Sequence, residues 1–396
     1  MELISEKMYE LGSKRSAIRE LFEYGKKRAE VVGAENVYDF SLGNPTVPAP
    51  DCVNELICEL TEELNSIQLH GYTSAQGDLS CRQAVADYLN QTYETHFHAD
   101  NFYMTMGAAA SLSLCFRSLT TSAEDEFITI APFFPEYRVF VEAAGAKLVV
   151  IPPDTSNFQI DFAALELALT PHTKGIIINS PNNPSGAVYK AQTITALAEL
   201  LRQKSKEFGT QIFLISDEPY REIAYDVEVP YVTKYYENTL VCYSYSKSLS
   251  LPGERIGFVL VPDEAYESKC LYAAICGAGR ALGYVCAPSL FQKVVARCVG
   301  ATGDIQAYRK NRDLLYDGLT RIGYECFKPD GAFYMFVKAL EEDADAFCEK
   351  AREEDILIVS AVGFGCPGYV RISYCVDADM IERSFAAFER LYHKYD

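Results

Sequence analysis

The sequence lacks the features that mark membrane proteins, exported proteins and proteins that bind nucleic acids. No run of about eighteen apolar residues is present, which is the length that a membrane-spanning helix needs. Residues 1–7 carry charges where a signal peptide needs an apolar run, so we expect no export signal. Lys and Arg number 36 against 55 Asp and Glu, giving a formal charge of −19. Because phosphate backbones need a basic face, this balance argues against a nucleic-acid partner.

Metal-binding and disulfide patterns are also missing. The thirteen cysteines are odd in number, and none of them forms a Cys-x-x-Cys pair. Only five histidines occur, and no Cys/His group has the spacing of a zinc site. His96 and His98 form a close pair, but no carboxylate cluster surrounds them. We therefore expect no metal, and a reduced, cytoplasmic protein whose thiols are mostly buried and inert.

What is present is a regular alternation of strand-like and helix-like segments. Short apolar runs, typical of strands buried on both faces, occupy residues 127–130, 147–151, 175–178, 211–215, 239–242 and 256–261. Helices are predicted between and around them, at residues 78–92, 109–120, 193–208 and 290–299. This alternation predicts an α/β fold in which helices cover both faces of a mostly parallel sheet.

The pattern changes near residue 290. Two long amphipathic stretches, 304–321 and 378–394, flank short strands near 332–337 and 369–374. We predict a large domain over residues 46–289, and a smaller α+β domain built from residues 1–45 and 290–396. For 396 residues, two domains agree with the usual relation between length and domain number.

Polar clusters follow several of the predicted strands. Ligands of open α/β sheets bind beyond the carboxyl ends of the strands, so these clusters should converge on one pocket. Lys247 follows one such strand in the run Ser244-Tyr245-Ser246-Lys247, and Arg255 comes eight residues later. A lysine so placed can hold an aldehyde cofactor as a Schiff base, while the hydroxyls and the arginine bind its phosphate. A solvated loop lysine is the alternative for this motif taken alone.

Other strand ends carry residues suited to a flat heterocycle. Asp217 can pair with a protonated ring nitrogen, and Tyr220 can donate to a ring oxygen. Asn183 lies in a Pro-rich turn from which its amide can donate to the same oxygen, and Phe134 can stack on the ring. Turn formation is the competing interpretation of Asp217 and Asn183, and simple core packing that of Phe134.

Two further segments are suited to anions. Gly107 opens a predicted helix with Ala108 and Ala109, whose small side chains let an anion reach free backbone N–H groups. Arg371 alternates with apolar residues in a late strand, where a substrate carboxylate or a structural salt bridge would pair with it.

Taken together and in this order, these motifs resemble the class I/II aminotransferases, which are pyridoxal-phosphate enzymes of fold type I similar to aspartate aminotransferase. The matching segments span residues 42–371: Leu42-Gly43-Asn44-Pro45, Gly71-Tyr72-Thr73, Gly107-Ala108-Ala109, Pro132-Phe133-Phe134-Pro135, Asn182-Asn183-Pro184-Ser185-Gly186, Asp217-Glu218-Pro219-Tyr220, Ser244 to Lys247, Gly253-Glu254-Arg255-Ile256-Gly257 and Arg371.

The resemblance assigns catalytic roles to Lys247, Asp217 and Tyr220, with Lys247 as the Schiff-base lysine and proton carrier. It implies that pyridoxal 5′-phosphate is bound by these residues together with Ala108, Ala109, Phe134, Asn183, Ser244, Arg255 and Tyr72. Tyr72 is expected to reach the cofactor phosphate of a partner subunit, which implies a homodimer. Gly43, Asn183 and Arg371 are the expected substrate contacts.

The implied activity is transfer of an amino group between an L-amino acid (aspartate, or an aromatic or broad range) and a 2-oxo acid such as 2-oxoglutarate, by a ping-pong cycle. Relatives specific for dicarboxylates place a partner-subunit arginine a few tens of residues after the lysine. Arg280, 33 residues after Lys247, is the candidate here, and a surface or helix-capping arginine is the alternative.

Two other activities stay open on the residues alone. A carbon–sulfur β-lyase of the same fold would use the same cofactor contacts. A Ser-x-x-Lys acyl transferase would use Ser244 and Lys247, but it also needs a Lys-Thr-Gly motif, which this sequence lacks.

Overall fold

The computed structural model describes residues 3–13 and 17–395, so Met1 and Glu2 of the charged N-terminal segment lie outside the described residues. The chain divides into two compact units. The small unit comprises Met1–Thr46, Gln306–Pro329 and Phe333–Asp396, and the large unit comprises Val47–Ile305 and Asp330–Ala332. The division of the sequence into domains at residues 45/46 and 289/290 stays a prediction.

The large unit is built on a seven-stranded sheet with the order β2-β8-β7-β6-β5-β3-β4. Its strands are β2 (Phe102–Thr105), β3 (Glu126–Ile130), β4 (Lys147–Ile151), β5 (Thr173–Asn179), β6 (Phe213–Asp217), β7 (Thr239–Ser244) and β8 (Gly257–Leu260). Only β8 runs against its neighbours, and the other pairings along the sheet are parallel. The predicted α/β fold with a mostly parallel sheet is therefore confirmed.

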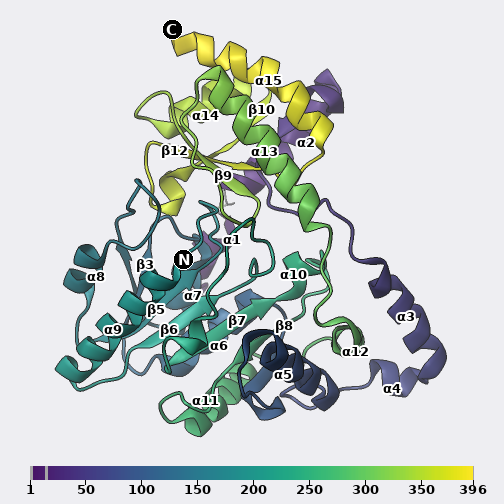
Figure 1. Ribbon diagram of the computed structural model, residues 1–396, viewed down its shortest axis with the longest axis vertical. Helices are drawn as coiled ribbons and strands as arrows, with labels where there is room; N and C mark the ends of the chain where they lie inside the picture. The colour runs from purple at the N-terminus through teal and green to yellow at the C-terminus, as the bar shows by residue number, and fades with distance from the viewer. Residues whose placement is uncertain (1–2, 14–16, 396) are drawn as a thin grey trace. The chain divides into compact units, whose positions relative to one another are not determined.

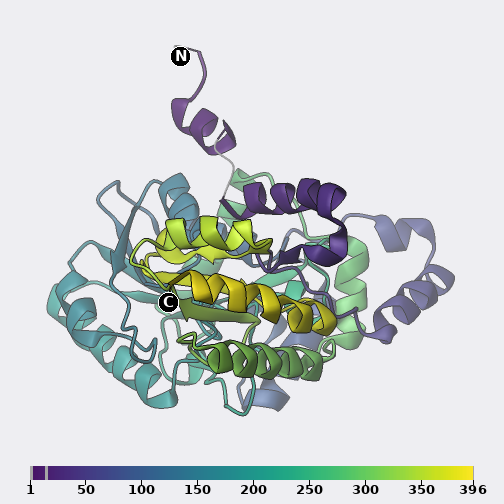
Figure 2. The same cartoon turned by 90° about the horizontal axis from the view of Figure 1, so that it is seen from above.

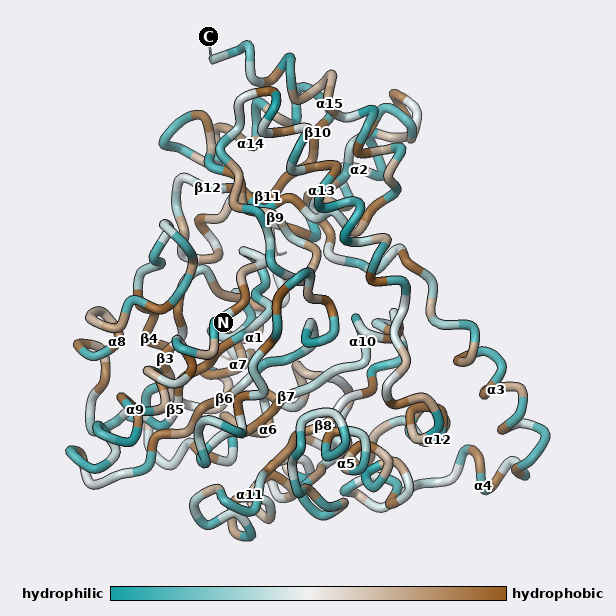
Figure 3. The backbone as a smooth tube through the Cα atoms, viewed as in Figure 1, coloured by the Kyte–Doolittle hydropathy of each residue, from teal (hydrophilic) through white to brown (hydrophobic). Residues whose placement is uncertain are grey.

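The strands of this sheet other than the half-buried edge strand β4 are buried on both faces, because their alternate residues enter different clusters. Phe127 and Ile215 pack with α6 (Ala108–Leu119), α7 (Glu136–Ala144) and α11 (Ser268–Ala281). Their neighbours Ile128 and Leu214 point the other way, toward α8 (Phe162–Ala168) and α9 (Ala191–Phe208), which lie beside the sheet in Figure 1. The strands are drawn largely in the brown of apolar residues (Figure 3), as the continuous apolar runs of the sequence predict.

The remaining part of the second face is covered by helices from two distant segments. They are α3 (Asp51–Glu63), α4 (Ser66–His70), α5 (Leu79–Tyr93) and α12 (Ser289–Cys298). Val85 of α5 and Val294 of α12 pack in one cluster with Tyr243 of β7. The four-residue helix α10 (Tyr245–Ser248) continues directly from β7.

The small unit combines elements from both ends of the chain. Strand β1 (Tyr38–Asp39) pairs in parallel with β10 (Ile356–Leu357). Strand β12 (Tyr369–Ser373) lies between β11 (Val359–Ser360) and β9 (Tyr334–Lys338), antiparallel to both. The helices of this unit are α1 (Glu6–Ser13), α2 (Ala17–Val32), α13 (Ile305–Ile322), α14 (Ala344–Glu353) and α15 (Ala378–Tyr392). Helices α13 (green) and α15 (yellow) run side by side in Figure 2, and Gly318 lets the ring of Phe385 come close to the α13 backbone.

Short 3-10 helices complete the chain: η1 (Ala34–Asn36), η2 (Ala99–Asn101), η3 (Val232–Lys234), η4 (Ala361–Phe364) and η5 (His393–Tyr395). Within residues 3–13 and 17–395, the helices are all too short or too polar to cross a bilayer.

Candidate active site

The ends of three neighbouring strands bring most of the candidate residues of the large unit to one edge of its sheet. Asn179 of β5 lies opposite Asp217 of β6, and Asp217 lies opposite Cys242 of β7. The segments that follow these three strands carry Asn183, Tyr220 and Lys247. Parallel pairing thus gathers residues that are up to 68 positions apart in the chain, counted from Asn179 to Lys247.

The carboxylate of Asp217 is the most unusual group at this edge. Its side chain is buried, and the hydroxyl of Tyr137 donates a hydrogen bond of 2.5 Å to its Oδ2. Its other oxygen, Oδ1, is buried and has no hydrogen-bond partner among the described residues. Burial raises the pKa of Asp217 to about 7, and the bond from Tyr137 opposes that rise. A buried carboxylate with one open oxygen requires a donor, and a protonated ring nitrogen is such a donor.

The Tyr137 hydroxyl is well suited to remain the donor in this pair. Burial, together with the neighbouring Asp217, raises the pKa of Tyr137 well above its usual range. The ring of Phe134 meets the ring of Tyr137 edge-on, with 5.7 Å between centroids. The half-buried Phe134 is therefore held next to the pair formed by Tyr137 and Asp217.

Asn179 connects Asp217 with the turn that carries Asn183. Its amide nitrogen donates to the backbone carbonyl of Asp217 at 2.8 Å, and its amide oxygen accepts from the backbone N–H of Asn183 at 2.6 Å. Asn183 and Tyr220 are both buried. One side chain thus fixes the relative positions of two segments with predicted cofactor contacts.

A second group of residues forms a cradle for an anion at the start of α6. Gly107 precedes α6 with a φ of 90°, in the region that favours glycine. A Cβ at this position would lie 2.7 Å from Arg255 Nη2 and 3.3 Å from Ser244 Oγ. The space beside the N-terminal N–H groups of α6, including those of Ala108 and Ala109, is therefore bordered by a cation and a hydroxyl. This combination is typical of phosphate sites.

Ser246 extends this cradle toward Lys247. Its hydroxyl lies 2.7 Å from Ser244 Oγ and accepts from Arg255 Nη1 at 3.2 Å. The Ser244 hydroxyl also caps α10 by accepting from the Ser246 backbone N–H. Lys247, which is half-buried, lies one residue further along α10.

The small unit brings its own candidate residues together. The guanidinium of Arg371 is buried, donates to the Ser41 carbonyl at 2.6 Å, and lies over the ring of Tyr334 at 4.6 Å. Gly43 lies so close to Tyr334 that a Cβ at this position would overlap the phenol oxygen. Arg371 and the 41–43 segment thus form one group, as two ligands for a single carboxylate would.

Tyr72 and Arg280 lie apart from these two groups. Tyr72 follows α4 and is 89% exposed. Arg280 is exposed in the last turn of α11, a location that favours a cation in any helix. The contacts described for a single copy of the chain assign no role to either side chain.

Three residues that the structure places in these groups had no role predicted from the sequence: Tyr137, Asn179 and Tyr334. Asn179 directly follows the predicted strand 175–178, in the polar cluster at its end, and that position was the available signal. Ser246 lies inside the lysine motif, whose hydroxyls were predicted only as a group to bind the phosphate. Tyr137 and Tyr334 carry no local signal, because their partners Asp217 and Arg371 are distant in the chain.

These residues fit pyridoxal phosphate. The open oxygen of Asp217 suits the ring N–H, and the α6 cradle suits a phosphate group. Lys247 directly follows Ser246 of this cradle in α10 and would supply the amine. Over residues 3–13 and 17–395, no three His, Cys, Asp or Glu side chains group as metal ligands would.

Comparison with known proteins supports the same class of enzyme. Residues 35–388 match the model of the aminotransferase class I and II family. The crystal structure of an amino transferase from Eubacterium rectale is 71% identical, covers 100% of this chain and 99% of its own, and superimposes with a TM-score of 0.99. A probable aspartate aminotransferase of Methanocaldococcus jannaschii is 29% identical over 96% of this chain and 97% of its own length. A probable N-acetyl-LL-diaminopimelate aminotransferase of Bacillus subtilis is 28% identical over 90% and 89%.

The family match covers nearly the whole chain, and the sheet that carries the candidate residues has the fold of type I pyridoxal-phosphate enzymes. The chain therefore belongs to the class I and II aminotransferase family.

Proposed function

We propose that this enzyme uses pyridoxal 5′-phosphate to transfer an amino group between an L-amino acid and a 2-oxo acid such as 2-oxoglutarate. The observation that carries the proposal is the buried Asp217 carboxylate with its open Oδ1. A buried carboxylate oxygen without a hydrogen-bond donor lowers the stability of the protein, and a ligand that donates to it removes that cost. Its location, at the sheet edge that leads into Lys247, suits the ring nitrogen of this cofactor.

In this proposal the large unit binds the cofactor. Lys247 holds its aldehyde carbon, and Asp217 keeps its ring nitrogen protonated. Tyr220 and Asn183 bind the ring's phenolate oxygen, and Phe134 packs on the ring. The phosphate is bound by Ser244, Arg255 and the N–H groups of Ala108 and Ala109. When bound, the cofactor supplies an electron-accepting ring that stabilises negative charge at the substrate's Cα.

The protein's own steps are binding and proton transfer. Arg371 would bind the α-carboxylate of the amino acid through a bidentate pair, together with the backbone of Gly43. Asn183 is a further proposed substrate contact. Lys247 would accept a proton from the substrate Cα as a general base and give that proton up again later in the cycle. Its amine must therefore be neutral when it accepts the proton.

We further propose that the enzyme is a homodimer in the cytoplasm. The exposure of Tyr72 supports the homodimer, because a residue that reaches a partner's phosphate is exposed in a single copy. Arg280 is proposed to bind the distal carboxylate of aspartate or glutamate in the partner's site. The name of the Methanocaldococcus relative, a probable aspartate aminotransferase, agrees with that substrate.

A panel of amino acids assayed against 2-oxoglutarate tests the activity and the substrate together. We expect an amino-acid-dependent formation of glutamate, with aspartate or an aromatic amino acid giving the highest kcat/KM. Pyruvate release from cystathionine without any added oxo acid would instead indicate a carbon–sulfur lyase. An unchanged kcat/KM for aspartate in Arg280→Leu would contradict the role of Arg280.

A further inference from the structure

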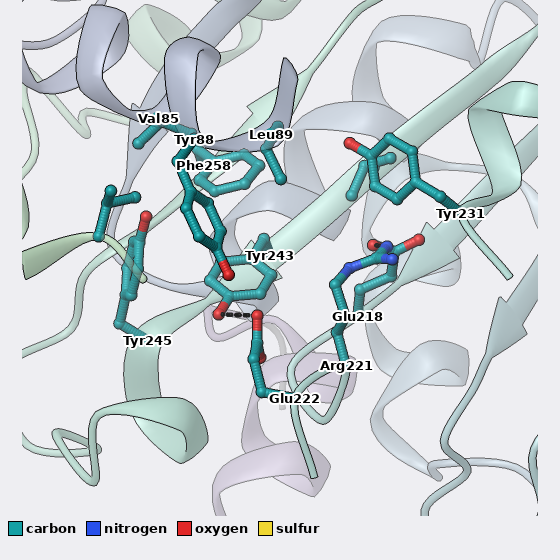
Figure 4. Close-up of a pocket in the computed structure, with 12 residues that line it drawn as sticks. Val85, Tyr88, Leu89, Glu218, Arg221, Glu222, Tyr231, Tyr243, Tyr245 and Phe258 are labelled. Atoms are coloured by element: carbon teal, nitrogen blue, oxygen red, sulfur yellow. Dashed lines mark hydrogen bonds and ion pairs between the residues drawn. The ribbon is translucent and has the colours of Figure 1, made fainter. Parts of the chain in front are cut away.

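A buried polar network lies on the opposite face of the sheet from Asp217, between the turn after β6 and helix α5. Figure 4 shows Glu222 of this turn facing Tyr243 of β7 and Tyr88 of α5, while Arg221 points toward Tyr231, all at the lining of a small cavity. The cavity has room for about one water molecule. Buried polar groups cost stability unless hydrogen bonds or ion pairs compensate for the lost contact with water.

The network has a direct chain of hydrogen bonds to the helix that carries Lys247. The hydroxyl of Tyr243 donates to Glu222 Oε1 at 2.8 Å, and its oxygen lies 2.9 Å from Ser248 Oγ. Because the single proton of Tyr243 goes to Glu222, the Ser248 hydroxyl is the donor in the second bond. The order is therefore Ser248 to Tyr243 to Glu222. Ser248 directly follows Lys247 in α10.

The far end of this chain is fixed by a buried cation. Arg221 is paired with Glu218 and lies over the rings of Tyr231, at 4.4 Å, and Tyr93, at 5.3 Å. Burial raises the pKa of Glu222, while Arg221 and the bond from Tyr243 oppose that rise.

Three buried atoms at the cavity have no hydrogen-bond partner among the described residues. They are Glu222 Oε2, Arg221 Nη1 and Tyr231 Oη. An internal water needs two to four polar partners, so polar atoms without partners beside a water-sized cavity are suited to bind one. Glu222 lines this cavity and is bonded to Tyr243 through Oε1, while its Oε2 has no partner among the described residues.

We propose that Glu222, Tyr243 and Ser248 form a positioning relay that holds α10, and with it Lys247, in the orientation needed to bind the cofactor. The inference rests on the proposed role of Lys247. A four-residue helix makes too few bonds of its own to hold a lysine still. The relay anchors its last residue to the turn that also carries Tyr220.

The test compares Tyr243→Phe with Tyr236→Phe in the full-length protein. Tyr236 is a matched control, because its buried hydroxyl donates one bond, to the Ile212 carbonyl at 2.6 Å, in the cluster with α8 and α9. The two readouts are the Kd of pyridoxal phosphate, titrated into apoprotein, and backbone hydrogen exchange of residues 245–250 in the apoprotein. The second readout needs neither cofactor nor activity.

We expect Tyr243→Phe to raise both the Kd and the exchange rate about tenfold, with Tyr236→Phe leaving both within about twofold of the wild type. Glu222→Leu should match Tyr243→Phe, and Glu222→Gln, which keeps an oxygen acceptor, should lie closer to the wild type. If Tyr243→Phe fails to fold, Ser248→Ala replaces it and is expected to show the same two changes.

The relay is overturned if Tyr243→Phe equals Tyr236→Phe in both readouts, or if Glu222→Gln equals Glu222→Leu. A wild-type protein that binds no pyridoxal phosphate overturns the proposed function instead. Normal binding by the wild type with unchanged variants removes the relay alone, so the two failures are distinguishable.

Discussion

At the scale of single residues, Asp217 shows how a binding site can reduce the stability of the empty protein. Its pKa is 3.8 in a typical exposed setting and about 7 in the folded chain, where burial disfavours the charged form. Between these values, a rise in pH removes the proton from the unfolded chain but not from the folded one. The stability of the apoprotein should therefore fall as the pH rises from about 4 to 7, and stay level above that.

Asp217→Asn tests this directly, because an amide does not ionise. The unfolding free energy of the apoprotein variant, relative to wild type, should rise by up to about 4 kcal/mol between about pH 4 and about pH 8. Urea unfolding at both pH values measures it. Asp87→Asn, at an exposed position of α5, is the control for loss of one surface carboxylate. A stability difference that is equal at both pH values would contradict the assigned burial effect.

At the scale of elements, the site depends on how closely strands and helices approach one another. Gly257 of β8 is paired with Thr105 of β2 and Ser244 of β7. A Cβ on Gly257 would lie 2.9 Å from the Gly107 Cα and 3.2 Å from the Ser244 Cα. This close approach brings the start of α6 next to the strand that leads into Lys247.

Gly107→Ala should therefore weaken cofactor binding by about tenfold or more, because the new methyl group would enter the space beside Arg255. Gly145→Ala is the control for a positive φ. Its φ of 94° is close to the 90° of Gly107, but nothing lies within 4 Å of a Cβ there. Gly107→Ala should lose more stability than Gly145→Ala in thermal unfolding, because the ψ of 173° at Gly107 is open almost only to glycine, whereas the ψ of 11° at Gly145 lies in the left-handed region. Equal Kd values of pyridoxal phosphate for the two variants would rule out the predicted cradle.

Continuous apolar runs were a reliable signal for the strands, since β3, β4, β5, β6 and β7 each overlap a predicted run. All of these except the half-buried edge strand β4 are buried on both faces. Helices α5, α6, α9, α12, α13 and α15 also lie within one or two residues of their predicted limits. No helix was predicted at α7 or α11. Helix α7 begins directly after Pro135, and the prolines at this point of the sequence indicate a turn. Helix α11 contains Gly277 and Gly279, and glycine has a low helix propensity.

Pairings between distant residues were beyond what the sequence could predict. Tyr137 and Asp217 are separated by 80 positions, and the phenol has no pattern around it that points to a carboxylate. The same holds for Tyr243 and Glu222, which meet only because β6 and β7 are adjacent. Local motifs predicted which residue types would gather, but the hydrogen bonds that orient them depend on the packed sheet.

At the scale of the whole molecule, the central question is whether one active site is shared between two copies. If Tyr72 of one copy serves the site of its partner, then Lys247→Ala and Tyr72→Ala subunits should complement each other. Each homodimer should have little activity, whereas a mixed dimer has one site with both native residues. Activity that appears after the two variants are unfolded and refolded together measures this. No recovery from a mixture in which mixed dimers are demonstrated would contradict the shared site.

The role of Lys247 as the cofactor-binding lysine is tested by chemical trapping. The protein is saturated with pyridoxal phosphate, reduced with borohydride and digested, and the modified peptide is identified by mass spectrometry. We expect the cofactor on the peptide that contains Lys247, and no such modification in Lys247→Ala. Cofactor attached at another lysine, or at none, would contradict this role.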